Sequence, residues 1–379
     1  MKIAVVHSFY AQNSPSGENI AVNLQVKALR NAGHEVELIG RQTDEQQHKF
    51  GYRLLSGLAA ANLTGPDPTP SLERFKPDVI HVHNLFPNWG TRWTAQWSTK
   101  IVATLHNYRT ICAAGTLWRD GHDCTECLTT SARAALTHRC YRGSALATAP
   151  LAWAARDQGV HSPILKNAQV LISLNTAMYE TYRQLIPDKR IEILPNFAEE
   201  LSMQSTSEPR GWVFIGRLTE EKGLSWLLVN WPREYALTII GSGPLEDLAR
   251  TYSLNEPDTF TFLGKQPHEH VRARLANAEG LVLPSKWAEG IPTVALEALQ
   301  LGTPMAVSNA CAASRELTAG DSGEIFSLEA GRAALRLAIQ KIHNNPKMRT
   351  AAENNYRLRF SQARWLNAMT AVYTTLHSH

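Results

Sequence analysis

Long apolar runs are missing from this sequence. No run reaches the roughly 18 residues that a membrane-spanning helix needs, so nothing in it indicates a transmembrane segment. The first ten residues hold one lysine and only four apolar residues before His7. That stretch is too short for a secretory signal peptide and predicts a buried strand. We therefore expect a cytoplasmic protein with reduced thiols and, at most, peripheral contact with the inner face of the membrane.

A strong charge of either sign is missing too, because the net charge is only +4. There is no basic stripe or nucleic-acid motif, which argues against a nucleic-acid partner. Residues 1–196 hold 20 Lys and Arg against 15 Asp and Glu, whereas the remainder holds 18 against 19. The mildly basic first half suits an anionic lipid surface or a phosphorylated substrate. Ordinary surface variation explains it equally.

Short β-branched runs alternate with helical patterns along the chain, which predicts parallel βαβ units. The first series of expected strands covers residues 2–8, 34–40, 78–84, 100–107, 168–175 and 190–197. The second covers residues 211–218, 235–243, 259–264, 280–285 and 303–309. Residues 136–162 are expected to form one long helical stretch, and residues 359–379 a final helix.

A polar segment, residues 196–210, separates the two series. The expected fold class is therefore α/β, with two doubly wound Rossmann-like domains facing a central cleft. The first domain should span residues 1–196, with residues 358–379 crossing back onto it, and the second residues 197–357. Because ligands bind at the carboxyl ends of parallel strands, residues that carry chemistry should follow strands.

Two glutamates, Glu289 and Glu297, lie on either side of a Gly-Ile-Pro turn. Pro292 is favoured at the start of a helix, where first-turn amides lack intrahelical partners and the helix dipole attracts an anion. Glu289 precedes this helix, where its carboxylate would accept hydrogen bonds from substrate hydroxyls. Glu297 lies inside the helix, either as a plain helix former or as the acceptor for vicinal hydroxyls such as those of a ribose.

Cations and glycines follow other expected strands of the second series. Arg217 comes directly after Gly216, and Lys222 five residues later. A planar guanidinium and a mobile ammonium suit a diphosphate, although a solvated loop explains the pair equally. Gly241 and Gly243 allow a ligand to approach the backbone closely. They fall short of the full dinucleotide fingerprint.

The first series offers fewer candidates. Gly17, between the first strand and the first helix, marks either a phosphate site or a plain helix cap. His106 ends a strand, at the place where a ligand would lie, although a lone histidine is more often structural. His81 and His83 alternate along another strand, so one of the two is expected to point into the core.

Taken in order, these stretches resemble glycosyltransferase family four, a large retaining family with the GT-B fold. The resemblance covers nearly the whole chain, and its most specific part is the two-glutamate motif preceded by residues 283–285. One departure is the pair Ser16-Gly17, where the family often has two glycines. It weakens the phosphate contact expected of the first loop and leaves the second domain's site intact.

The resemblance implies that the second domain binds a nucleotide-sugar donor and the first a glycan or lipid-linked glycan acceptor. Arg217 and Lys222 would hold the diphosphate, Glu297 the ribose and Glu289 the donor sugar, while His106 would lie near the reacting carbon. The implied catalytic set is His106, Arg217, Lys222 and Glu289. The implied donor-binding residues are Gly17, Gly216, Arg217, Lys222, Gly241, Gly243, Gln266, Glu289, Gly290, Ile291, Pro292, Thr293, Val294 and Glu297.

The resemblance further implies transfer of a hexose-type sugar from a UDP- or GDP-sugar, in surface polysaccharide or related glycoconjugate biosynthesis. The family retains the anomeric configuration by same-face attack, with the leaving phosphate as the favoured base. No cofactor is then needed for catalysis. Two alternatives remain, a non-hydrolysing sugar-nucleotide epimerase of GT-B architecture and a non-catalytic GT-B partner protein. A nicotinamide dehydrogenase is disfavoured because the first loop lacks its glycine pattern.

Four of the five cysteines cluster in the sequence, at Cys112, Cys124, Cys127 and Cys140. Their spacing is not that of a standard zinc finger, so a structural zinc, unpaired thiols and an acquired disulfide all remain as interpretations. A similar cluster occurs in a subset of the resembling family. Residues 84–97 add three tryptophans, which suit sugar stacking, a membrane interface or a core position.

Overall fold

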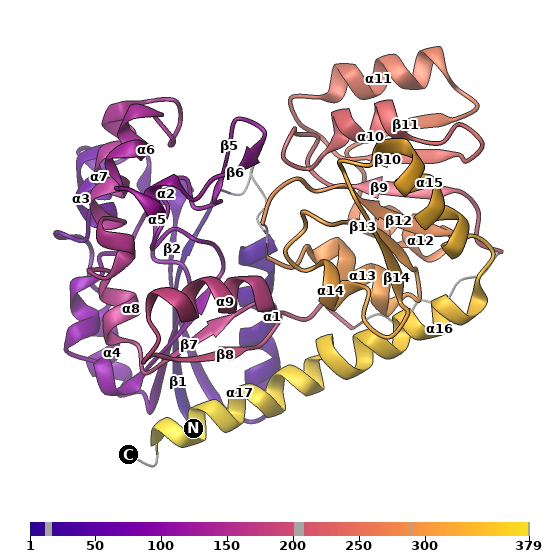
Figure 1. Cartoon of the computed structure of the whole chain (residues 1–379). Helices are drawn as coiled ribbons and strands as arrows, with labels where there is room; N and C mark the ends of the chain where they lie inside the picture. Colours follow the sequence, from indigo (N-terminus) through magenta and orange to yellow (C-terminus); the bar gives the residue numbers. More distant parts are fainter. Residues whose placement is uncertain (12–16, 201–207, 289, 378–379) are drawn as a thin grey trace. The chain divides into compact units, whose positions relative to one another are not determined.

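The computed structural model describes residues 1–11, 17–200, 208–288 and 290–377. Contacts between residues divide the chain into two compact units, each considered by itself. Unit 1 comprises Met1–Arg119, Cys124–Asn196 and Trp365–His379, and unit 2 comprises Asp120–Asp123 and Phe197–Arg364. In each unit a parallel sheet is flanked by helices (Figure 1).

Among the described residues, the sheet of unit 1 has six parallel strands in the order β2-β1-β3-β4-β7-β8. They are β1 (Lys2–Phe9), β2 (Glu35–Gln42), β3 (Val79–Val82), β4 (Ile101–Leu105), β7 (Val170–Ser173) and β8 (Arg190–Ile193). The inner strands β3, β4 and β7 are buried throughout, which is why they have continuous apolar sequences rather than alternating ones. The sequence predicted all of these strands.

Helices connect the strands of unit 1. They are α1 (Gly17–Asn31), α2 (Thr43–Gln46), α3 (Tyr52–Ala60), α4 (Thr69–Phe75), α5 (Glu126–Thr129), α6 (Arg133–Thr137), α7 (Ala145–Ala154), α8 (Pro163–Asn167) and α9 (Thr176–Leu185). Two short strands, β5 (Trp118–Arg119) and β6 (His122–Asp123), come between β4 and α5 in the chain.

The expectation of one long helix over residues 136–162 is wrong. Helix α6 ends at Thr137, and Arg139 and Arg142 then adopt φ angles of 49° and 55°. These left-handed conformations interrupt a right-handed helix. Helix α7 starts afresh at Ala145, where the Ser144 side chain accepts a hydrogen bond from the Ala147 amide and caps the new N-terminus.

Among the described residues, the sheet of unit 2 also has six parallel strands, in the order β11-β10-β9-β12-β13-β14. They are β9 (Trp212–Ile215), β10 (Leu237–Ile240), β11 (Phe260–Gly264), β12 (Gly280–Leu283), β13 (Met305–Ser308) and β14 (Gly323–Phe326). The helices are α10 (Leu224–Asn230), α11 (Glu246–Asn255), α12 (His268–Ala276), α13 (Thr293–Gln300), α14 (Ser314–Leu317), α15 (Gly331–Ile342) and α16 (Pro346–Asn355). The sequence did not predict β14, because it is a half-buried edge strand with little apolar sequence.

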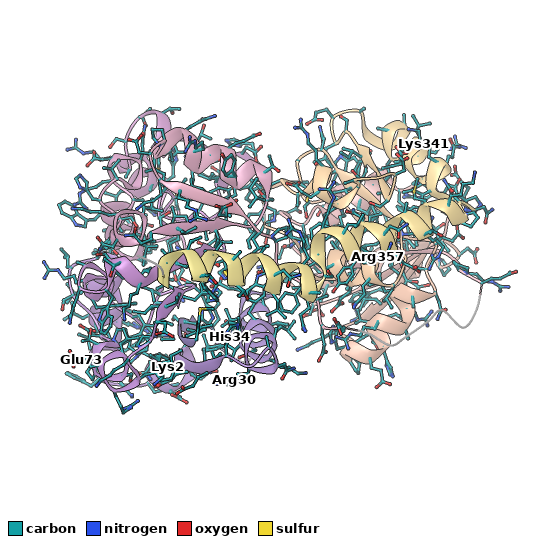
Figure 2. All side chains as sticks on the ribbon, turned by 90° about the horizontal axis from the view of Figure 1, so that it is seen from below. Lys2, Arg30, His34, Glu73, Lys341 and Arg357 are labelled. Atoms are coloured by element: carbon teal, nitrogen blue, oxygen red, sulfur yellow. The ribbon has the colours of Figure 1, made fainter. Side chains whose placement is uncertain are left out.

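The last helix, α17 (Gln362–His377), begins after a π-helical turn at Tyr356–Phe360. Trp365, Met369 and Tyr373 recur at intervals of four residues and are buried, so one face of the helix joins a core. The Tyr373 hydroxyl lies 2.7 Å from Nδ1 of His81 in β3, which attaches this helix to unit 1, along which it runs in the view from below (Figure 2). Within the described part of the chain, we find no helix with the length and apolarity required to span a bilayer.

Candidate functional site

The candidate site lies at the carboxyl edge of the sheet in unit 2. The chain adds β10 and β11 on one side of β9 and then β12, β13 and β14 on the other, so the winding direction reverses between β9 and β12. Ligands of open parallel sheets bind outside the strand ends at such a reversal. The residues predicted for the second domain follow β9, β10, β11 and β12 at this edge (Figure 1).

Glycines hold the loops after β9, β10 and β11 against one another. The Gly241 amide donates a hydrogen bond to the Gly264 carbonyl at 2.9 Å. Gly241 has a φ of 146°, and a Cβ there would lie 1.8 Å from the Gly216 carbonyl oxygen. A Cβ on Gly243 would lie 2.6 Å from the Leu218 carbonyl oxygen. These glycines therefore allow the loops that line the edge to approach each other closely.

Replacing Gly241 by alanine should destabilise unit 2 by about 2–4 kcal/mol, because the added Cβ meets backbone that cannot move aside by changing rotamer. Gly216→Ala is the matched control, since no atom lies within 4 Å of its added Cβ. We expect the control to change the free energy of unfolding by less than about 1 kcal/mol. Urea unfolding of both variants measures the difference, and equal losses would remove the packing argument.

Both predicted cations belong to the loop after β9. Nη2 of Arg217 lies 3.4 Å from Oε1 of Glu221, and the Arg217 side chain is 63% exposed. Nζ of Lys222 lies 5.8 Å from the centroid of the Trp287 ring, in the loop after β12. The Lys286 amide donates a hydrogen bond to the Glu221 carbonyl at 2.9 Å. This hydrogen bond therefore joins the loop after β9 to the loop after β12, on either side of the reversal. Arg217 and Lys222 both lie in the loop after β9.

Helix α13 starts within the two-glutamate motif. Pro292 occupies the N-cap position with an extended backbone, and Thr293 is the first helical residue. The Ala295 amide already donates a hydrogen bond to the Pro292 carbonyl at 3.0 Å. The amides of Thr293 and Val294 precede that first intrahelical bond, so they are the helix-start donors placed for an anion.

The residues just before α13 are only partly accounted for. Glu289, predicted to bind the donor sugar and to be catalytic, lies outside the described residues. Gly290 follows it directly, and the Ile291 side chain is buried in the core beneath α13. Because this side chain is buried, Ile291 can contact a ligand only through its backbone amide.

Glu297 lies beside a histidine that the sequence analysis did not identify. Its side chain is 11% exposed, and Oε1 lies 2.7 Å from Nε2 of His268, the first residue of α12. A carboxylate has acceptor capacity for several hydrogen bonds, so this contact orients Glu297 and leaves it able to accept others. Gln266, predicted near the nucleotide base, lies two residues before His268, and its Nε2 donates to the Leu263 carbonyl at 2.6 Å. The place of His268 directly after β11 is the signal that would have found it.

Unit 1 holds four histidines near the ends of β1, β3 and β4. Nδ1 of His83 lies 2.8 Å from Nε2 of His106. His81 is engaged at both nitrogens, 2.7 Å from the hydroxyl of Thr104 and 2.7 Å from that of Tyr373. His81 and His83 are both buried, whereas the sequence predicted that one of the two rings would point into the core.

Burial keeps this histidine cluster uncharged. It lowers the pKa of His7 to about 4 and that of His81 to about 3. It also lowers the pKa values of His83 and His106 well below the usual range, and the neighbouring histidines lower them further. His106 and His83 line a pocket of about 100 Å³ together with Arg109. His106 is thus a neutral ring at a strand end beside a cavity, a position suited to hydrogen bonding with a sugar.

Comparison with known protein families matches almost the whole chain in two parts. Residues 16–196 match the glycosyl transferase 4-like domain, and residues 200–359 match glycosyl transferases group 1. The chain carries two glycosyltransferase domains. Unit 1 therefore holds the 4-like domain and unit 2 the group 1 domain, and the candidate site at the carboxyl edge lies in the latter.

Curated relatives align with only part of this chain. An uncharacterized glycosyltransferase of Methanocaldococcus jannaschii is 31% identical over 121 residues, which are 30% of this chain and 30% of that protein. Glycogen synthase of Mycobacterium tuberculosis is 30% identical over 148 residues, or 36% of this chain and 35% of that enzyme. The aligned segment spans about a third of the length of these relatives.

Solved structures align along the full length and show the fold. Sucrose-phosphate synthase from Thermosynechococcus elongatus has a TM-score of 0.64 at 19% identity, with 100% of this chain and 99% of that chain covered. The lipopolysaccharide outer core galactosyltransferase WaaB has a TM-score of 0.61 at 15% identity, covering 99% and 100%. Anabaena HepE, solved with UDP and glucose, has a TM-score of 0.60 at 14% identity, covering 99% and 100%. The predicted GT-B fold class is therefore confirmed.

In the glycosyl transferase 4-like domain, Gly17 is the first residue of α1, and the loop before it lies outside the described residues. The next residue, Glu18, is a feature that the sequence analysis missed. Burial raises its pKa to about 8, although a hydrogen bond from Asn84 and the charge of Arg109 act in the opposite direction. At neutral pH this carboxyl group is mainly protonated and can donate a hydrogen bond.

The four clustered cysteines of the 4-like domain lie near one another. Burial raises the pKa of Cys127 to about 11, and Cys112, Cys140 and Cys124 each contribute to the increase. Across the described residues, no group of three or more His, Cys, Asp or Glu side chains is arranged to hold a metal ion. The thiols as placed do not fit a zinc site, and burial favours the protonated form of Cys127, whereas a metal ligand is a thiolate. The structural zinc stays a prediction of the sequence, and no step below uses it.

Two of the three tryptophans in residues 84–97 lie in the core of the 4-like domain. Trp89 and Trp93 are buried, and their indole nitrogens donate to the carbonyls of His7 and Gly90 at 3.0 and 2.8 Å. These two rings therefore fit the core position, which is one of the three interpretations that the sequence left open.

Proposed function

We propose that the chain is a retaining glycosyltransferase. It moves a hexose-type sugar from a UDP- or GDP-sugar to a glycan or lipid-linked glycan acceptor, in surface polysaccharide or related glycoconjugate biosynthesis. The observation that carries the proposal is the carboxyl edge of the group 1 domain, where Arg217, Lys222, the start of α13 and the carboxylate of Glu297 share one sheet reversal. Cations, helix-start amides and a buried carboxylate are the groups that a diphosphate joined to a ribose requires.

The donor lies along this edge with its parts in series. Glu297 accepts hydrogen bonds from the two ribose hydroxyls, held in place by His268. The amides of Thr293 and Val294 and the side chains of Arg217 and Lys222 meet the diphosphate. Glu289 binds hydroxyls of the sugar, and the base lies near Gln266. Anabaena HepE, which has a similar fold, was solved with UDP-glucose, which supports a uridine nucleotide as the first candidate.

Electrostatic stabilisation of the departing nucleoside diphosphate carries the reaction. As the bond to the sugar breaks, negative charge grows on the leaving phosphate, and fixed donors around it lower the barrier. The acceptor hydroxyl attacks from the face that the phosphate leaves, and its proton passes to that phosphate, so the anomeric configuration is kept. Arg217 and Lys222 supply the positive charge, and His106, uncharged, hydrogen-bonds the sugar near the reacting carbon.

A thermal-shift screen of the full-length protein with UDP-, GDP- and ADP-sugars tests the proposal. A ligand that binds only the folded state stabilises it in proportion to the logarithm of its concentration over its Kd. We expect one nucleotide series to raise Tm by several degrees at about 100 times its Kd, since that saturation adds about 2.7 kcal/mol. A flat response to all three series would count heavily against a transferase that uses nucleotide sugars.

A further inference from the structure

Large apolar side chains are exposed on two neighbouring helices of the 4-like domain and in the turn just before one of them. Phe50, two residues before α3, and Leu54, in the first turn of α3, are 105% and 69% exposed. Leu146 and Trp153, on α7, are 89% and 52% exposed. Exposed leucines occur singly on most proteins and need no explanation, but a group of this size on adjacent elements indicates a binding surface.

The spacing places the exposed side chains of α7 on its outward face. Leu146 and Trp153 are seven residues apart within α7, so they share one helix face. Leu54 lies in the first turn of α3, and Phe50 in the turn that precedes the left-handed N-cap Gly51. The opposite face of α7 is fixed by Leu151, which is buried in a small core shared with α6. Helices α3 and α7 contact each other directly and lie together in Figure 1. We call these four exposed side chains the α3–α7 surface.

The segments that carry the α3–α7 surface are basic. Residues 47–62 and 131–163 contain six Lys and Arg and a single Asp. Lys49, Arg53 and Arg142 are exposed. The guanidinium of Arg156 lies 4.1 Å from the centroid of the Trp153 ring, so an amphipathic aromatic ring and a cation share one end of α7.

We propose that the α3–α7 surface docks on an anionic lipid bilayer. Protruding apolar side chains among basic ones are the pattern of interfacial helices, in which the apolar groups enter the headgroup boundary and the cations meet lipid phosphates. Tryptophan is favoured at that depth because its ring is apolar and its N–H polar. The tryptophans at positions 89 and 93 do not contribute, because both are buried. This inference does not depend on the proposed transfer reaction.

Vesicle sedimentation of the full-length protein tests the docking. The wild type should pellet with vesicles of phosphatidylcholine and phosphatidylglycerol and much less with phosphatidylcholine alone, and added salt should weaken the binding. The double variant Phe50→Ser, Leu54→Ser should bind the anionic vesicles at least about tenfold more weakly, and Trp153→Ser should lower binding similarly. The matched control is Leu254→Ser, Leu337→Ser, which changes leucines of the group 1 domain that are 74% and 56% exposed.

Three outcomes would overturn the proposal. The wild type would stay in solution with anionic vesicles, or the α3–α7 variants would pellet as well as the control. Alternatively, light scattering would find a wild-type dimer that these variants convert to a monomer, which would assign the surface to a second copy of the chain. Circular dichroism and Tm of every variant show that it is folded, as expected for substitutions at exposed positions.

Discussion

Lys222→Ala is expected to lower kcat by about 100- to 1000-fold. Removing one fixed donor from developing negative charge costs about 3–4 kcal/mol in the barrier, and Lys222 lies on the loop between β9 and α10 at the point where the sheet reverses. The ammonium acts mainly as the phosphate departs, so we expect kcat to fall more than KM rises. The free energy of unfolding should change by less than about 1 kcal/mol, because the residue is partly exposed.

Two further variants separate this role from general charge. Lys222→Arg keeps a positive charge with a different geometry and should recover part of the activity. Lys347→Ala removes an exposed lysine of α16, also in the group 1 domain, and should leave kcat unchanged. If Lys222→Ala turned over at the rate of the Lys347→Ala control, the loop after β9 would have no part in stabilising the leaving group.

Below pH 6.5 the 4-like domain is expected to lose stability steeply. His7, His81, His83 and His106 have folded-state pKa values lowered from 6.5 by desolvation. The unfolded chain therefore takes up protons that the folded domain does not, and stability falls as pH falls. Glu18 acts in the opposite sense, because its pKa is raised from 4.5 to about 8 and the folded state holds its proton. The net difference is about three protons, or at most about 4 kcal/mol per pH unit.

Above pH 6.5 the same groups predict a shallower slope. Near pH 7 the unfolded histidines still hold about one proton between them, which offsets Glu18, so the slope passes through zero there. Between about pH 7 and 8 Glu18 is the main difference between the states, and stability should fall by less than about 1.4 kcal/mol per pH unit. Glu18→Gln should remove this alkaline slope and leave the acid slope in place. Hydrogen exchange of peptides from β1, β3 and β4 in urea, measured from pH 5.5 to 8, follows the stability of this domain. Equal stability at pH 5.5 and 7 would mean that the histidines are already protonated in the folded domain.

The strands were predictable because parallel inner strands have continuous apolar sequences that end at polar or glycine residues. β3 and β12 are short but unmistakable by this criterion. β14 was not, since a half-buried edge strand with the sequence Gly-Glu-Ile-Phe lacks that pattern. The long helix over residues 136–162 was predicted wrongly because apolar periodicity cannot detect the left-handed turn at Arg139 and Arg142.

The candidate site was predictable only where its residues are close in sequence. The spacing within the α13 motif located the helix start and Glu297, because both belong to one strand–loop–helix unit. His268 could not be connected with Glu297, since 29 residues separate them and only the packing of α12 beside α13 brings them to 2.7 Å. The raised pKa of Glu18 depends on burial in the same way, which sequence alone does not give.

Calorimetric titration with the nucleotide that stabilises the protein tests the central claim, that Glu297 holds the ribose at the carboxyl edge of the group 1 domain. Glu297→Ala should weaken binding by about 10- to 100-fold, since hydrogen bonds to a charged group contribute about 1.5–3 kcal/mol. His268→Ala removes only the orienting contact and should weaken binding less. Unchanged affinity in a folded Glu297→Ala protein would contradict the account, because the nucleotide would then bind somewhere else.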